Sequence, residues 1–387
     1  MPACPILYLK IRAPCQSAGG GKAGTPVGKK ILTINLGTTS TRLAVFEEDR
    51  LLAERDLIHP EEDIKNMTQK EHVAQRKELM EKWLKEIGVS ISSLAGIAMR
   101  IANLPKSILG GTIEIKDQLR RDLAAHYQPE KPLTHGTDIT LALADAVCGE
   151  EKVPYYVVDP ANQNNMIPEA RISGHPIFQR STIFHALNQK SVAHLQAEKL
   201  GRKYEACNFV VAHMGGGISV CAHEQGRIID TTNCSGEDGP FSGTRTGTLP
   251  ARQLIDLCFS GKYRYEEVLG MLLWKGGVSA YLGTGDMREV EKRANSGDEQ
   301  AALIFRTVAY RTAKEIGAMC AAMNGKVDGI ILTGGMSNSQ AMCRMIEEKV
   351  SRFAPVSVYA GERESEALAA GVLRILNHEE EAAVYPD

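Results

Sequence analysis

The sequence predicts a two-domain α/β protein in which one structural unit occurs twice. Residues 31–56, ILTINLGTTSTRLAVFEEDRLLAERD, and residues 208–232, NFVVAHMGGGISVCAHEQGRIIDTT, share one pattern. Each reads as an apolar strand, a glycine-rich turn, a second strand, a tight turn and a third strand. The chain has 387 residues, more than a single ordinary core requires. Strand-like and helix-like segments alternate between the two copies, so we expect one copy in each of two α/β domains.

The remaining elements follow from the period of the apolar residues. Helical spacing predicts a helix over 65–87 that stops at Gly88, and a long helix over 298–324 that is closed by Asn324 and Gly325. Continuous apolar runs predict buried strands at 94–102, 153–160 and 327–335. A last helix is expected over 364–380.

The N-terminal segment differs from the rest of the chain. Residues 1–30 have five basic and no acidic side chains, a glycine cluster, and an apolar stretch too short for a signal peptide. We expect a disordered extension, and an organelle-targeting role stays open. The stretch GTPVGKK has three residues between its glycines where a P-loop has four, and it ends on Lys30 where Ser or Thr is needed, so we assign no P-loop.

Composition narrows the choice of partners. The formal net charge is -2 at pH 7 with acids and bases interspersed, which provides no footprint for nucleic acid or an anionic membrane. No apolar run approaches the roughly twenty residues of a membrane span. Nine scattered cysteines without a CxxC pair are typical of reduced thiols in the cytosol, not of a disulfide framework or a zinc site. We expect a soluble, cytoplasmic protein with a small-molecule partner.

The turn after the first strand is rich in hydrogen-bond donors. Gly37 is followed by the hydroxyl side chains of Thr38, Thr39, Ser40 and Thr41, and then by Arg42. Backbone N–H groups, hydroxyls and one cation suit an anion such as phosphate. The alternative is a polar hairpin tip exposed to water. We call residues 37–42 the hydroxyl turn.

The corresponding turn of the second copy contains three glycines in a row. Gly215, Gly216 and Gly217 let the backbone approach phosphate oxygens where a Cβ would clash. The alternative is a mobile loop. We call residues 213–219, HMGGGIS, the glycine turn.

Taken together, the ordered motifs resemble the acetate and butyrate kinase family, most closely its butyrate and branched-chain carboxylic acid kinases. The stretches that carry the resemblance are TINLGTTSTRLAVFE, VVDP, RISGHP, IFHALNQKSVA, VAHMGGGISVCAHEQGRIIDTTN, GPFSGTRTGTLP, LCFSGKY, KGGVSAYLGTGDMREVE, AKEIGA and GKVDGIILTGGMSNS. The family lies in the actin, sugar-kinase and Hsp70 superfamily. The resemblance implies two duplicated ribonuclease-H-like (actin-like ATPase) domains that face an active-site cleft, and a homo-oligomer. The expected domains are 31–160 with the C-terminal helix 367–387, and 161–366.

The resemblance also implies which residues bind ATP or ADP. The phosphates would be held by the hydroxyl turn together with Asn35 and by the glycine turn, and the adenosine by GDMRE and TGGMSN. The implied residues are Asn35, Gly37, Thr38, Thr39, Ser40, Arg42, His213, Gly215, Gly216, Gly217, Asp286, Met287, Arg288, Gly334, Gly335, Met336, Ser337 and Asn338. Taken alone, the last two motifs would be an ordinary helix start and a turn.

By the same resemblance, phosphoryl transfer would rest on Asp159, His185 and Arg245. An acid substrate is already ionised at pH 7 and needs no general base, so Asp159 is expected to hold Mg²⁺ or its waters. Glu366 is the expected second acid at the metal, with Glu364 as the alternative. His185 would steady the transferring phosphoryl group, and Arg245 would offset the repulsion between carboxylate and triphosphate. The alternatives are a turn-forming Asp159, a structural His185 and a surface Arg245.

Two stretches depart from the family pattern. A second active-site arginine is expected in a glycine-flanked segment, whereas this chain has MRIANLP, in which Arg100 is the candidate. After VDP the chain reads ANQNNMIP, which is more polar than in butyrate kinases and could shift the preferred acid. We expect reversible ATP-dependent phosphorylation of a short-chain fatty acid to an acyl phosphate. The alternatives are another phosphotransferase of the superfamily, such as a sugar kinase, or a slow ATPase switch or chaperone-like module.

Overall fold

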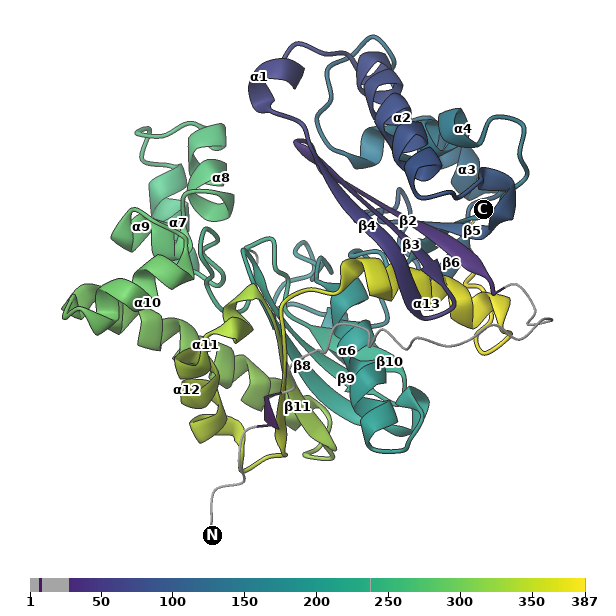
Figure 1. The fold of residues 1–387 in the computed structure, drawn as a ribbon. Coiled ribbons are helices and arrows are strands. Elements are labelled where there is room, and N and C mark those ends of the chain that lie inside the picture. Colours follow the sequence, from purple (N-terminus) through teal and green to yellow (C-terminus); the bar gives the residue numbers. More distant parts are fainter. Residues whose placement is uncertain (1–6, 9–27, 237, 387) are drawn as a thin grey trace. The chain divides into compact units, whose positions relative to one another are not determined.

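The computed structural model describes residues 7–8, 28–236 and 238–386 (Figure 1). Most of the predicted extension 1–30 lies outside these residues; within it, Leu7–Tyr8 form the short strand β1. The chain divides into two compact units. Unit 1 is built on Asn165–Glu362 with β1, and unit 2 on the described residues from 28 to Asn164 and those from Arg363 on.

Unit 2 contains a six-stranded sheet in the order β4-β3-β2-β5-β7-β6. Strands β2, β3 and β4 form an antiparallel meander, β2, β5 and β7 run parallel, and β6 is antiparallel to β7. The strands are β2 (Lys30–Leu36), β3 (Ser40–Glu47), β4 (Arg50–Ile58), β5 (Leu94–Met99), β6 (Thr112–Glu114) and β7 (Tyr155–Val158). The predicted meander and the predicted strands at 94–102 and 153–160 are confirmed.

Unit 1 repeats this order as β10-β9-β8-β11-β12-β1. Its first five strands have the same relative directions as those of unit 2, whereas its sixth, β1, is parallel to β12. The strands are β8 (Asn208–Met214), β9 (Ile218–Glu224), β10 (Arg227–Thr231), β11 (Gly329–Gly334) and β12 (Val356–Ala360). The prediction of a duplicated α/β unit is therefore confirmed.

Helices cover both faces of the unit 2 sheet. Helix α13 (Glu364–Leu376) packs on β2, β5 and β7, and α4 (Thr137–Cys148) lies on the other face with α2 (Gln69–Glu86) against it (Figure 1). Helix α2 begins after Thr68, whose side chain accepts a hydrogen bond from the Glu71 N–H in a capping box. The predicted helices 65–87 and 364–380 are confirmed. The short helices are α1 (Glu61–Ile64) and α3 (Asp117–Ala124).

In unit 1, α6 (Ala186–Lys199) packs on β8 and β11, while α11 (Glu299–Ala322) covers the opposite face over β8, β9 and β10 (Figure 1). Helices α10 (Met287–Asn295) and α12 (Gln340–Val350) pack on α11. The predicted helix 298–324 is confirmed, since Asp298 caps α11 and Asn324 and Gly325 follow it with positive φ. The remaining helices are α5 (Pro168–Arg171), α7 (Ala251–Cys258), α8 (Tyr265–Leu273) and α9 (Gly277–Leu282). Across the described part of the chain, every helix is too short or too polar to cross a bilayer.

Candidate active site

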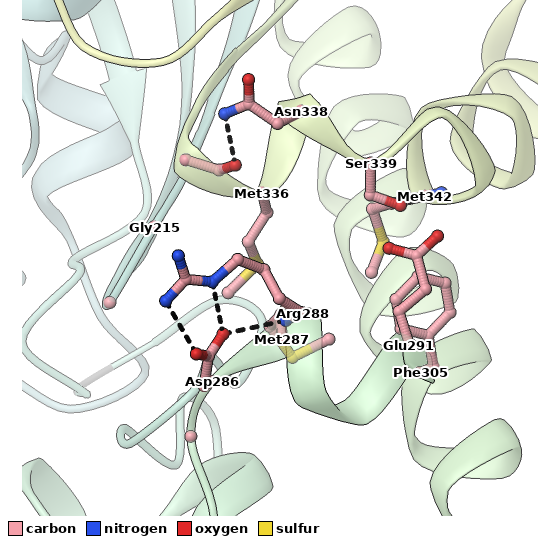
Figure 2. A pocket seen from close by; sticks show the side chains of 13 residues that line it. Gly215, Asp286, Met287, Arg288, Glu291, Phe305, Met336, Asn338, Ser339 and Met342 are labelled. Carbon is pink, nitrogen blue, oxygen red and sulfur yellow. Dashed lines mark hydrogen bonds and ion pairs between the residues drawn. The ribbon is translucent and has the colours of Figure 1, made fainter. Parts of the chain in front are cut away.

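Unit 1 contains a cavity of about 690 Å³ beside the glycine turn. Its walls combine thioethers and an aromatic ring with a small number of polar groups (Figure 2). It is lined by Gly215, Gly216, Gly285, Asp286, Met287, Arg288, Glu291, Phe305, Gly335, Met336, Asn338, Ser339 and Met342. Such a mixture is typical of a small-molecule site, where an apolar wall takes a flat ring and convergent polar groups orient it.

Most of the residues predicted to hold adenosine meet at this cavity. They come from the start of α10 and from the short 3₁₀ helix Gly335–Asn338 that follows β11. Gly334 and the buried Ser337 belong to the same segment without lining the cavity. The Asn338 side chain donates to the Gly335 carbonyl at 2.9 Å, which holds the segment in its turn (Figure 2).

Asp286 and Arg288 form a compact pair at the cavity wall. Asp286 caps α10, and its Oδ1 accepts a hydrogen bond from the Arg288 N–H at 2.9 Å. The Arg288 guanidinium donates to both carboxylate oxygens, at 3.0 and 2.8 Å (Figure 2). These hydrogen bonds, first the one from the side chain and then the one from the backbone, lower the pKa of Asp286 from 3.8 to about 2. The carboxylate is therefore ionised at neutral pH.

The glycine turn joins β8 to β9 and lies against Arg245. The Gly215 N–H donates to the Gly217 carbonyl at 2.9 Å, and the Ser242 hydroxyl donates to the Gly216 carbonyl at 2.6 Å. A Cβ added at Gly217 would lie 2.2 Å from Arg245 Nη1. Arg245 Nη1 itself donates to the Cys234 carbonyl at 2.6 Å. Glycine at position 217 thus makes room for a guanidinium beside the turn.

Two histidines stack at the start of the glycine turn. The rings of His185, which precedes α6, and His213 on β8 lie 3.7 Å apart with an interplanar angle of 4°. Asn188 Nδ2 lies 3.0 Å from His213 Nδ1 and donates to it, so a neutral His213 carries its proton on Nε2. That nitrogen is 3.3 Å from Glu362 Oε1. The structure therefore brings His185 against His213, the first residue of the glycine turn, within unit 1.

In unit 2, three predicted residues lie at the carboxyl edge of the sheet. Strands β2, β5 and β7 are parallel; Ile34 pairs with Met99, and Met99 with Val157. Asn35, Arg100 and Asp159 consequently follow at nearly the same level, and the Arg100 N–H donates to the Ile34 carbonyl at 2.9 Å. The carboxyl edge of parallel strands is where open α/β sheets bind ligands.

Asp159 occupies an unusual backbone position at this edge. Its φ is 43°, in the left-handed region that non-glycine residues seldom adopt. The side chain is 4% exposed, and its Oδ1 accepts a hydrogen bond from the Gly111 N–H at 3.1 Å. The Asp159 N–H donates back to the Gly111 carbonyl at 3.1 Å. Strain of this kind collects at functional positions and is consistent with a placed carboxylate.

The two candidate glutamates at the start of α13 have different surroundings. The Glu364 carboxylate accepts a hydrogen bond from Asn35 Nδ2 at 2.6 Å and forms an ion pair with Arg100, whose Nε lies 2.8 Å from Glu364 Oε1. Glu366 instead accepts from the neighbouring Arg363 at 3.3 Å. Of the two acids, Glu364 is the one that joins Asn35 and Arg100 at the carboxyl edge.

The hydroxyl turn closes the hairpin of β2 and β3. Gly37, Thr38 and Thr39 form the turn, whereas Ser40 and Arg42 belong to β3. The Arg42 guanidinium donates to both oxygens of Asp56 on β4, at 2.7 and 3.1 Å. Arg42, the cation predicted for this turn, is therefore held in an ion pair between β3 and β4.

Sequence reasoning missed part of the cavity. Glu291 and Phe305 come from α10 and α11, and Ser339 and Met342 from the start of α12. Phe305 and Met342 are ordinary apolar positions in helical patterns, so the sequence offers no signal that they face a cavity rather than the core. Ser339 caps α12, accepting from the Met342 N–H, and that role was readable from its type.

Comparison with known proteins agrees with the duplicated α/β fold and with the resemblance seen in the sequence. Residues 159–381 match the model of the Acetokinase family. The chain is 41% identical to Butyrate kinase 2 of Clostridium acetobutylicum over 359 residues, 92% of this chain and 99% of that relative. The structure is similar to that of Porphyromonas gingivalis acetate kinase, with a TM-score of 0.74 and 18% identity, covering 90% of this chain and all (100%) of the other. A propionate kinase from Francisella tularensis gives a TM-score of 0.70 at 19% identity over 89% and 98% of the two chains. The two solved structures show the fold alone, whereas the family match and the 41% identity show descent: this chain belongs to the acetokinase family.

Proposed function

We propose that this protein transfers the γ-phosphoryl group of ATP to a short-chain fatty acid, such as butyrate or isobutyrate, giving an acyl phosphate and ADP. The same site would run the reverse, ATP-forming reaction. The observation that carries the proposal is the 41% identity, over 92% of the chain, to a protein named Butyrate kinase 2. The geometry of the cavity and of its arginine and histidine neighbours supports it.

We assign the cavity of unit 1 to the nucleoside of ATP. Met287, Phe305 and Met342 supply the apolar wall for a base, while Asp286, Asn338 and Ser339 offer polar atoms for its edge and for the ribose. Gly215 and Gly216 line the same cavity, so the backbone of the glycine turn is available to phosphate oxygens. We assign phosphate binding to the hydroxyl turn of unit 2 as well.

We assign the stabilisation of the transferring phosphoryl group to Arg245 and His185. An arginine stays charged and its planar fork binds two oxygens at once, which suits a reaction between two anions. One nitrogen of Arg245 is anchored on the Cys234 carbonyl. His185 is fixed by the Ser219 hydroxyl, 2.9 Å from its Nδ1, and by the stack on His213. Fixed donors of this kind need no reorganisation during the reaction.

Mg²⁺ fits the carboxylates at the carboxyl edge of the unit 2 sheet. This ion typically takes one or two carboxylates and completes its shell with water and substrate phosphates. Asp159 and Glu364 would hold it there, with Glu364 preferred over Glu366 because Glu364 faces Asn35 and Arg100. When bound with ATP, the ion would neutralise charge on the phosphates. Over the described ranges, no three His, Cys, Asp or Glu side chains cluster as a metal site.

The polar stretch after Asp159 could influence which acid the protein prefers. Asn162 bonds to the backbone of Leu104, accepting from its N–H at 3.0 Å and donating to its carbonyl at 2.8 Å. It thus holds the loop after Arg100, so the polarity of this stretch is partly structural. We therefore keep unbranched and branched acids of two to five carbons as candidate substrates.

A hydroxamate assay tests the proposal. The protein is incubated with ATP, Mg²⁺ and acetate, propionate, butyrate or isobutyrate, and hydroxylamine traps any acyl phosphate. We expect trapped product that depends on the acid, with kcat/KM ranking the substrates. Phosphoryl transfer to a sugar, or ATP hydrolysis that no acid accelerates, would refute the proposal and indicate another phosphotransferase or a slow ATPase.

We further propose that the protein forms a homo-oligomer through unit 1. Helix α7 has no buried residue although it carries Ile255, which is 56% exposed, and it is followed by Phe259, which is 87% exposed. Trp274, which follows α8, and Tyr281, in α9, are also exposed. Exposed apolar groups in such density are typical of protein interfaces. Light scattering on the purified protein would give the mass, and a monomer at all concentrations would refute this assignment.

We place the protein in the cytoplasm on the state of its thiols. The cysteines at 148, 207, 221, 234, 258, 320 and 343 are free, and all but Cys258 are buried. Burial raises the pKa of the Cys320 thiol to about 11 and that of Cys343 to about 12, which keeps them protonated and unreactive. Reduced thiols of this kind are typical of cytoplasmic proteins, and fractionation of the cells would test the assignment.

A further inference from the structure

The hydroxyl turn is supported from beneath by a buried arginine that the proposed mechanism does not use. Arg76 lies on α2 between Val73 and Met80, on the helix face that packs into unit 2, and its side chain is 0% exposed. Arginine is seldom buried unless its donors are satisfied. Burial lowers the pKa of Arg76 to about 10, so it stays charged at neutral pH.

The Arg76 guanidinium donates to the inner side of the turn. Nη1 lies 3.0 Å from the Gly37 carbonyl and 3.1 Å from Thr41 Oγ1, and Nη2 lies 2.7 Å from the Thr38 carbonyl. The next carbonyl along, that of Thr39, accepts from the His59 N–H at 2.8 Å. The carbonyls of Gly37 and Thr38 thus point toward the buried Arg76, and that of Thr39 is held by His59, directly after β4.

Peptide geometry then fixes where the N–H groups point. In a planar trans peptide, the N–H of one residue points opposite to the carbonyl of the residue before it. Because Arg76 holds the carbonyls of Gly37 and Thr38, the N–H groups of Thr38 and Thr39 point away from Arg76. No acceptor within the described ranges takes these two N–H groups, and both residues are exposed. Successive free donors on the same side of a turn can form an anion-binding concavity.

Charge acts in the same direction as geometry. No carboxylate pairs with Arg76 among the described residues, so its positive charge is not neutralised. The titratable neighbours are His59 and His72, whose pKa values are lowered by burial and then by Arg76 itself, which leaves both neutral. A buried, unpaired cation behind the turn attracts an anion in front of it, and low local dielectric strengthens the attraction.

We propose that Arg76 is a positioning residue for phosphate: it aims the Thr38 and Thr39 N–H groups outward and makes the hydroxyl turn electropositive, so that the turn binds the phosphates of a nucleotide. The proposal rests on the proposed function only for the nature of that ligand. Arg76 touches no ligand, and its contribution passes through the backbone.

Binding measurements on the full chain test this role. The dissociation constants of ATP and of adenosine are measured by calorimetry for the wild type, Arg76→Met and Arg76→Lys. We expect Arg76→Met to weaken ATP by about tenfold or more while adenosine, which has no phosphate, keeps its affinity. Arg76→Lys keeps the charge but cannot hold two carbonyls, so its ATP affinity should fall between the two.

Met80→Ala is the matched control. Met80 is fully buried on α2, four residues after Arg76, but its side chain has no N–H group that could hold the carbonyls of the hydroxyl turn. It should lower the stability of unit 2 while the ratio of ATP to adenosine affinity stays unchanged. If Arg76→Met does not fold, Arg76→Lys carries the test by the same ratio.

An unchanged ratio in folded Arg76 variants, or the same change in Met80→Ala, would overturn the inference. Failure of the proposed function appears elsewhere: a wild type that binds ATP through Arg76 but gives no acid-dependent hydroxamate would retain the inference and lose the carboxylate kinase.

Discussion

The hydroxyl turn of unit 2 and the glycine turn of unit 1 occupy the same place in two repeated sheets, yet they are built from different parts. The first joins β2 to β3 and the second joins β8 to β9. Each has an arginine beside it, but Arg76 comes from a helix and donates to carbonyls, whereas Arg245 comes from a loop and lies alongside Gly217. Arg76 is fully buried and Arg245 is partly exposed.

This difference separates two ways in which an arginine can serve an anion. A buried guanidinium that is spent on carbonyls shapes the backbone and leaves the ligand to N–H groups. A partly exposed guanidinium that is anchored by one nitrogen still offers donors to the ligand itself. We therefore expect the loss of Arg76 to act on nucleotide affinity and the loss of Arg245 to act on turnover.

The largest effect is expected at Arg245. Arg245→Ala should lower kcat by about 10³ or more, roughly 4 kcal/mol of transition-state stabilisation, with ATP affinity nearly unchanged. Arg245→Lys should not restore turnover because lysine lacks the planar fork. Arg100→Ala is the companion measurement: Arg100 is paired with Glu364, and we expect its loss to act mainly on KM for the acid. Equal loss of kcat in both variants would show that the two arginines act together.

A second large effect is expected from a single methyl group at Gly217. The new Cβ of Gly217→Ala would lie 2.2 Å from Arg245 Nη1 and 3.1 Å from the Cys234 carbonyl, so Arg245 must move. A displaced catalytic group commonly costs about 10² in rate, so steady-state kinetics should show kcat reduced by about that factor. Gly216→Ala meets nothing within 4 Å and should cost less. The reverse ranking would mean that the turn, rather than Arg245, is what Gly217 protects.

These outcomes also indicate how far the sequence predicts the structure. The repeated meander and the strand and helix positions were readable because period and glycine turns are local signals. No role was assigned to Arg76 from the sequence. Its position between Val73 and Met80 on an apolar helical stripe nevertheless indicates a buried charge, which usually has a structural or functional role. The choice between Glu364 and Glu366 could not be made from the sequence. Side chains two residues apart on a helix point about 200° apart, so a small error in register exchanges the two glutamates.

The stability of the protein should also depend on pH through His59, which lies beside the hydroxyl turn. Burial, followed by the charge of Arg76, lowers the pKa of His59 from 6.5 to about 4. Between pH 6.5 and about pH 4, His59 binds a proton in the unfolded chain but not in the folded chain. The free energy of unfolding therefore falls as the pH is lowered. The loss from His59 should reach about 2 kcal/mol between pH 7 and pH 5. Urea unfolding of the wild type and of His59→Gln at both pH values measures it; equal slopes in the two proteins would contradict the assignment.

The smallest effect is expected at the tip of the hydroxyl turn. Thr38 is exposed, so a change of its side chain should leave the fold intact. Thr38→Glu should therefore leave the melting temperature unchanged while like-charge repulsion weakens ATP binding by about tenfold. Thr38→Gln has the same length without the charge and is the control. Unchanged ATP affinity in the glutamate variant would return the turn to a solvent-exposed hairpin tip.

The division of labour between the two turns is tested most directly by measuring acyl phosphate formation from butyrate and ATP in the wild type, Arg76→Met and Arg245→Ala side by side. We predict that Arg76→Met raises the KM and the dissociation constant of ATP while most of kcat is kept at saturation. Arg245→Ala should keep the dissociation constant and lose kcat by about 10³. Two variants that change the same parameter, or a wild type that makes no acyl phosphate, would contradict the account.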